Sequence, residues 1–87
     1  MKAVIRGIHT EEVIELSHID YEYEGISVNP ILKIWAEDTL SDIPFIISDP
    51  RFACMGSEGI SGKGYMRKVS IEGDLISYIY VSFFISF

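Results

Sequence analysis

Basic residues are scarce in this chain, and their scarcity limits the partners that it can bind. Its 87 residues include seven Lys and Arg against thirteen Asp and Glu, which gives a net charge of −6. Because binding to phosphates requires a basic footprint, we expect no direct nucleic-acid partner. Such an acidic domain suits a basic protein surface, although the charge could instead serve solubility alone.

Cysteine and the common metal-binding spacings are also nearly absent. Cys54 is the only cysteine, so no disulfide can form within the chain, and the reducing cytoplasm is the expected compartment. Its apolar neighbours Phe52 and Met55 predict a buried, inert thiol. His9 and His18 form no HxH, HExxH or CxxC spacing, so we expect both to be solvated or locally hydrogen-bonded, and we expect neither a metal nor a cofactor.

No apolar run in the chain is long enough for a membrane-spanning helix, and we expect no signal peptide because Arg6 and His9 interrupt the apolar run near the N-terminus. The longest, LISYIYVSFFISF at residues 75–87, has thirteen residues, whereas a span needs about 20. Its β-branched and aromatic composition predicts a strand instead. The core face of that strand would hold Leu75, Ile79, Val81, Phe83, Ile85 and Phe87. The other face carries Tyr78, Tyr80 and Phe84 and needs cover from an N-terminal helix, a second sheet layer or another chain.

Alternating apolar residues predict a single, mostly β domain over residues 1–87. Further strands are expected at residues 2–8, 21–28, 31–36, 45–47 and 65–72. Thr10 followed by two acids predicts a short helix to about Ser17, although the segment VIEL also fits a strand. The connections are too short for parallel crossovers. We therefore predict an α+β fold, mostly β: a bent antiparallel sheet or small sandwich of four to six strands, with one short N-terminal helix.

Glycines mark two of the predicted connections. Residues 51–64 contain four glycines without periodicity, which predicts a mobile loop. This loop does not match a phosphate-binding P-loop, because Gly64 follows Lys63 where a Ser or Thr is required. Gly73 and Asp74 predict a two-residue hairpin turn that would place Val69 opposite Tyr78.

Acids and tyrosines alternate in one segment, which comprises Asp20, Tyr21, Glu22, Tyr23 and Glu24. Catalytic carboxylates need dissimilar environments, and neighbours on one strand offer none, so we predict no enzyme activity. A negative strip flanked by tyrosines can receive Lys and Arg side chains of a protein partner, although a solvated strand face explains the pattern equally well. Glu37 and Asp38, at the start of a predicted loop, are expected to extend this contact.

Several of these segments together resemble a known family. The opening MKAVIRGIH, the Thr–acid stretch after it, the tyrosine–acid segment and the apolar strand ending near SDPRF resemble small bacterial immunity proteins. These are the partners of contact-dependent and other polymorphic toxins, and they include the immunity protein 8 group. The resemblance covers about the first 55 residues, and the C-terminal stretch has no counterpart in that family. It implies a cytoplasmic protein that binds a toxin domain, expected to be basic, and blocks its active site or substrate access.

Two other functions fit the same sequence. The protein could be a structural or assembly subunit that forms a homodimer or larger oligomer through its C-terminal strand, with Tyr78, Tyr80 and Phe84 in the contact. A small-ligand pocket inside the bent sheet is the third alternative, and it depends on fold analogy alone.

Overall fold

The protein is a six-stranded antiparallel barrel. The computed structural model describes residues 1–24, 29–37, 44–69 and 72–87, and the side chains of residues 22–24, 29 and 69 are left aside. The strands are β1 (Lys2–Arg6), β2 (Glu11–Glu24), β3 (Asn29–Ala36), β4 (Phe45–Met55), β5 (Gly59–Val69) and β6 (Ile76–Ser86). Each strand pairs with the next along the chain, and all pairs are antiparallel, as predicted.

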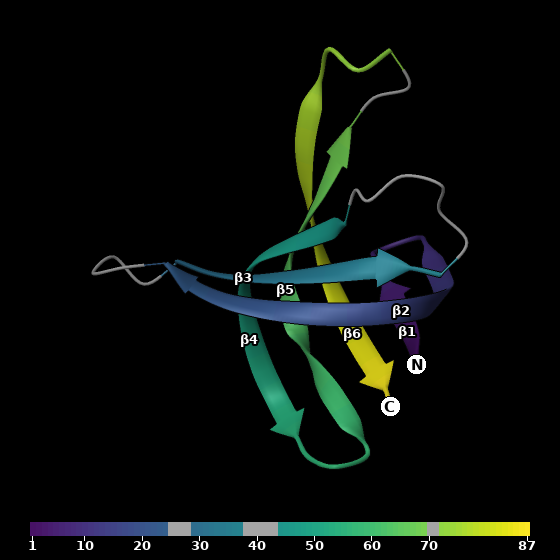
Figure 1. Cartoon of the computed structure of the whole chain (residues 1–87). Helices are drawn as coiled ribbons and strands as arrows, with labels where there is room; N and C mark the ends of the chain where they lie inside the picture. The colour runs from purple at the N-terminus through teal and green to yellow at the C-terminus, as the bar shows by residue number, and fades with distance from the viewer. Residues whose placement is uncertain (25–28, 38–43, 70–71) are drawn as a thin grey trace.

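The sheet closes on itself, so the predicted open sheet or sandwich is wrong (Figure 1). Closure comes from β1, which pairs with β2 on one side and with β6 on the other. The first and last strands of the chain therefore lie side by side. Closure removes the sheet edges along the paired part of both strands, and it allows one face of all six strands to share a single interior.

The predicted N-terminal helix is also wrong, because residues 11–24 form strand β2. Within β2, Ile14 and Leu16 are turned toward the interior while Val13 is exposed, which is the period-two pattern of a strand. The carbonyl of Thr10 accepts a hydrogen bond from the Gly7 amide at 2.9 Å, so Thr10 closes the β1–β2 turn rather than starting a helix. In the described part of the chain we find no helix that could span a membrane.

The glycine-rich segment 51–64 is two strands rather than a mobile loop. Strands β4 and β5 occupy most of it, and only residues 56–58 connect them. Gly62 is buried where β5 passes close to β4: a side chain there would collide with the Arg51 carbonyl and would lie 2.9 Å from the Phe83 ring. The absence of a side chain at Gly62 therefore permits the close approach of strands that a barrel this small requires.

Strand β4 bends at Asp49 and Pro50, where the sequence had predicted that a strand ends. The β4–β5 register shifts between Ser48 and Arg51, which marks a β-bulge. Asp49 has a φ of 49°, in the left-handed region that Asp tolerates better than most residues. Pro50 has no amide hydrogen to contribute to the ladder, and a bulge is one of the few strand positions that accept it.

The interior is filled by apolar side chains from all six strands, and no polar side chain is buried among the described residues. Its fully buried members are Ala3, Ile5, Leu16, Leu32, Ile34, Ile47, Ile60, Met66, Val81, Phe83 and Ile85. The predicted core face of the tail is thus confirmed for Val81, Phe83 and Ile85. It is wrong for Leu75, Ile79 and Phe87, which are exposed.

A two-stranded arm extends beyond the barrel (Figure 1). We define the arm as residues 67–69 of β5 and 76–78 of β6, which in the described structure pair only with each other. Val69 lies opposite Ile76, and Arg67 lies opposite Tyr78. The register therefore differs by two residues from the predicted one, because residues 70–75 connect the strands in place of a two-residue turn. A two-residue shift changes each partner but leaves every side chain on its predicted face.

Replacing Gly62 by Ala should destabilise the fold, because the added methyl group meets a backbone carbonyl that cannot move without disturbing β4. We expect a loss of about 2 kcal/mol of unfolding free energy. The matched control is Gly56→Ala, since a side chain at Gly56 meets nothing within 4 Å. Urea denaturation followed by circular dichroism measures both variants, and equal midpoints would contradict the proposed close approach.

Candidate functional site

The acids of β2, which the sequence suggested as the partner contact, are matched by cations of this chain. Arg6 Nε donates to Glu11 Oε1 at 2.9 Å, and Lys68 Nζ donates to Glu12 Oε1 at 3.1 Å. Glu15 lies opposite Lys2 on β1. Cations of the same chain therefore offset much of the negative charge of β2 in the free protein.

The predicted strip around Asp20 is only partly assembled. Asp20 is exposed and lies opposite Lys33 of β3. Tyr21 is half-buried, and its ring packs edge-on against Phe52 at 5.0 Å, so it belongs to the core side rather than to a contact surface. Residues 22–24 continue β2 opposite β3, but the side chains of Glu22, Tyr23 and Glu24 are outside the described part.

The two loop residues predicted to extend the strip do not strengthen it. Glu37 is exposed, and its amide donates to the Glu15 carbonyl at 2.8 Å. Asp38 lies outside the described residues. The structure therefore places Glu37 near Glu15 rather than beside the tyrosines.

Among the described residues, three of the seven cations have no acidic partner, and they lie together on the outer side of β4 and β5. Arg51, Lys63 and Arg67 are exposed, and none makes an ion pair or a side-chain hydrogen bond with any residue that the structure describes. The other four cations, Lys2, Arg6, Lys33 and Lys68, lie opposite or bond to the acids of β2. The fold thus separates matched charge from unmatched positive charge.

Aromatic rings surround these cations. Tyr78, Tyr80 and Phe84, predicted to need cover, are 59%, 51% and 51% exposed, so the expected cover by a helix is wrong. Tyr65 joins them, and its ring meets that of Tyr80 edge-on at 5.1 Å. We call this outer surface of β4, β5 and β6 the cation–aromatic face; it consists of Arg51, Lys63, Tyr65, Arg67, Tyr78, Tyr80 and Phe84.

The strand registers arrange the cation–aromatic face in rows. Arg67 lies opposite Tyr78, and Tyr65 opposite Tyr80. The next row has Arg51 opposite Lys63. Successive rows are two residues apart, or about 7 Å along the strands. A row of two rings is therefore followed directly by a row of two cations.

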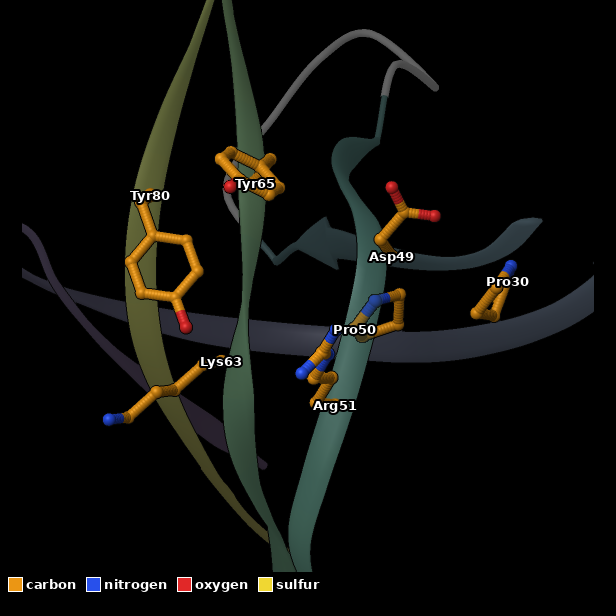
Figure 2. Close-up of a pocket in the computed structure, with 7 residues that line it drawn as sticks. All are labelled: Pro30, Asp49, Pro50, Arg51, Lys63, Tyr65 and Tyr80. Carbon is orange, nitrogen blue, oxygen red and sulfur yellow. The ribbon is translucent and has the colours of Figure 1, made fainter. Parts of the chain in front are cut away.

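A groove hollows this face at the base of the arm (Figure 2). Its volume is about 600 Å³, and its walls are Pro30, Asp49, Pro50, Arg51, Lys63, Tyr65 and Tyr80. A second hollow of about 470 Å³ shares Arg51, Lys63 and Tyr80 with the first, so the depression continues along β5. In Figure 2 the Tyr80 hydroxyl is directed toward Lys63, across the two strands.

No arrangement typical of an enzyme occurs in the part of the chain described. His, Cys, Asp and Glu side chains there form no cluster of three that could hold a metal. Cys54 is exposed rather than buried, so that prediction is wrong; it lies at the end of β4, near the turn to β5. His18 stacks on Trp35 at 4.2 Å and contacts the Ser17 hydroxyl at 3.0 Å, consistent with the predicted local role.

Comparison with known proteins returned no matching family model, no match among the curated proteins and no match among the solved structures.

Sequence reasoning missed Arg51 and Lys63 because residues 51–64 were taken for a loop, and it placed Tyr65 and Arg67 on a strand at 65–72 without joining them to these cations. The signal was present in the order Lys63, Tyr65, Arg67, in which long side chains alternate with Gly64 and Met66. That alternation identifies a strand with one buried face once the glycines are read as close-contact positions.

The pair of cations at Arg51 and Lys63 should weaken the fold slightly, because like charges directly opposite in a ladder repel. Lys63→Gln is expected to raise the unfolding free energy by a few tenths of a kcal/mol at low salt, and added salt should reduce the difference. Lys2→Gln removes the same charge opposite Glu15 and should give no such gain. Thermal denaturation at two salt concentrations measures both variants, and identical shifts would contradict this account.

Proposed function

We propose that the protein is a non-catalytic toxin-neutralising protein, which binds a toxin domain through the arm and the adjoining part of the cation–aromatic face. The observation that carries the proposal is the exposed cluster of aromatic and apolar side chains that the closed barrel leaves uncovered. Tyr and Arg, which are prominent in this surface, are the residue types that most often supply binding energy at protein interfaces.

The size of the exposed cluster suits a stable complex. Seven large apolar side chains between a third and two thirds exposed lie on β5, on β6 or in the connection between them: Tyr65, Leu75, Ile76, Tyr78, Ile79, Tyr80 and Phe84. At roughly 100 Å² each, they offer roughly 700 Å² of surface. A typical specific interface buries about 800 Å² on each partner, so this surface is close to the area required.

The shape of the arm supports an inhibitor in particular. Tyr78 in the arm and Ile79 at its base point to opposite faces of β6, and both are exposed. A thin, two-stranded element with apolar groups on both faces can enter a cleft and contact both of its walls. Insertion of this kind is one way to block an active site.

The resemblance of the N-terminal segments to bacterial immunity proteins supports a toxin as the partner. The contact differs from the one that the sequence suggested, because the described acids of β2 already face cations of the same chain. The surface of the toxin is then expected to complement rings and cations rather than a strip of acids.

Truncating an arm residue should weaken binding at least tenfold without unfolding the protein. We expect co-expression with the product of the adjacent upstream gene to yield a complex, and Tyr78→Ala to weaken it at least tenfold, as the loss of a central aromatic contact does. The matched control is Val13→Ala, since Val13 is also 59% exposed but lies on β2. Isothermal titration calorimetry on the purified pair measures both, and the absence of a complex would refute the proposal.

Assembly through β6 is the second candidate function, and the unpaired part of this strand favours it. Residues 76–81 pair with β5 on one side, whereas β1 covers only residues 82–86 on the other. An exposed strand edge can add a strand from a second copy. Sedimentation velocity at tens of micromolar would show a dimer if this edge pairs, and a monomer only would exclude it.

A further inference from the structure

We infer that the groove at the base of the arm is a binding site for nucleoside phosphates joined in a single-stranded nucleic acid. The inference goes beyond the proposed function and does not depend on it. It departs from the expectation that an acidic chain has no direct nucleic-acid partner, because the structure shows where the charges lie rather than how many there are.

The first argument is the unmatched pair of cations in the groove. Arg51 and Lys63 lie directly opposite each other, and neither has an acidic partner in the described structure. Every described acid of β2, by contrast, faces a cation. Asp49 lines the same groove but makes no ion pair with either cation in the described structure. Two adjacent cations repel each other when the groove is empty, and a bound phosphate removes that repulsion. The groove is therefore completed by an anion.

The second argument is the pair of rings next to these cations. Tyr65 and Tyr80 form the adjacent row, about 7 Å away along the strands. Bases stack on such rings while the phosphates contact neighbouring Lys and Arg, which is the usual arrangement in proteins that bind single strands without sequence preference. One groove thus offers rings on which the base of a nucleotide can stack and cations that can bind its phosphate.

The negative charge at the rim limits how a strand can lie. Asp49 lines the side of the groove formed by β4, and the bulge holds it at a φ of 49°. A phosphate on that side would be repelled, so the sugar–phosphate backbone should pass over Lys63 and Arg51. The Asp49 carboxylate can instead accept a hydrogen bond from an amino group of a base.

Continuity along β5 favours a strand over a single nucleotide. The groove shares three wall residues with the second hollow, and that hollow shares Ser61 with a third one that reaches Phe84. Arg67 and Tyr78 continue the face in the other direction. Rings and cations therefore follow β5 and β6 from Arg67 and Tyr78 to Lys63, which suits an extended ligand with several bases and charges, whereas the third hollow adds the ring of Phe84 and the acid Glu58 but no cation.

The net charge of −6 does not oppose this placement at close range. Glu11, Glu15 and Asp20 of β2 face β1 and β3, whereas Glu12 bonds to Lys68 of β5, and Asp49, Glu58, Glu72 and Asp74 lie on the side of β4, β5 and β6. In physiological salt the screening length is about 8 Å, so charges farther away contribute little at the groove. The surplus of acids should slow the approach of a strand and make its binding weaker than that of a basic protein.

Fluorescence anisotropy with a labelled eight-nucleotide oligothymidylate and the intact chain tests the inference. With three cations contacting phosphates, the plot of log K against log salt should have a slope of about −2. A duplex of the same length and a poly-glutamate peptide of equal charge are the comparison ligands. Binding of the oligonucleotide well above both supports the inference, whereas no saturable binding, or equal binding of the duplex or the peptide, overturns it.

Variants then locate the site. Tyr80→Ala should weaken oligonucleotide binding about tenfold through the loss of stacking. Lys63→Gln should weaken binding and make the salt slope shallower by about 0.7, while the free protein becomes no less stable. Lys2→Gln and Val13→Ala, on β1 and β2, should leave binding unchanged. If Lys2→Gln weakens binding as much as Lys63→Gln, the effect is non-specific and the groove is not the site.

One further measurement distinguishes a nucleic-acid strand from a single nucleotide as the ligand. The outcomes for the variants then distinguish failure of the toxin proposal from failure of the groove inference. Competition by adenosine monophosphate at the same affinity as the oligonucleotide would overturn binding of a strand, whereas weak competition agrees with it. The toxin proposal fails if no complex forms with Tyr78 intact, whatever the oligonucleotide does. The groove inference fails if Tyr80→Ala and Lys63→Gln leave oligonucleotide binding unchanged, whatever the toxin does.

Discussion

The unequal lengths of the two strands that close the barrel determine most of its surface. β1 has five residues and β6 has eleven, so their pairing uses only residues 82–86 of β6. The closed part buries Phe83 and Ile85, and the rest of β6 continues past the end of β1. The arm and the free strand edge both follow from this one mismatch. A longer β1 would cover that edge, whereas the outward-facing rings would stay exposed, as Phe84 does opposite Val4 of β1.

The charged side chains also differ between the two sides of the barrel, one formed by β1, β2 and β3 and the other by β4, β5 and β6. On the side of β1, β2 and β3, each described acid of β2 bonds to or lies opposite a cation, so that side is electrostatically matched within the chain. On the side of β4, β5 and β6, Lys68 pairs with Glu12, whereas Arg51, Lys63 and Arg67 have no acidic partner among the described residues, and the rings beside them are exposed. The barrel closes through its apolar interior without any of these groups, so folding does not account for their position.

The sequence predicted some local features correctly, missed others and did not predict the closure. Period-two alternation predicted strands at residues 2–8 and 31–36, close to the observed β1 and β3, and the buried face at Val81, Phe83 and Ile85, because side-chain direction in a strand depends on position alone. Closure depends on contacts between the two ends of the chain, and no local pattern reports them. The helix expected after Thr10 failed because capping and acid preferences are weak beside the pairing of β2 with two neighbours. The sequence did not predict the groove, because the glycines of residues 51–64 were interpreted as loop residues. In the structure they are positions where strands approach most closely.

An exposed apolar arm and a repelling pair of cations are both unfavourable for a chain of this size on its own. Small domains bury little surface and have little stability in reserve, so each such feature removes part of a narrow margin. Both features lie on the same three strands, beside the same groove, while the opposite side of the barrel has matched charges. Binding relieves both at once, because a partner that covers the rings and supplies negative charge removes apolar surface from water and neutralises the cations. The stability of the free protein and its affinity for a ligand should therefore change in opposite directions when Lys63 is neutralised, which a purely structural role for that residue would not produce.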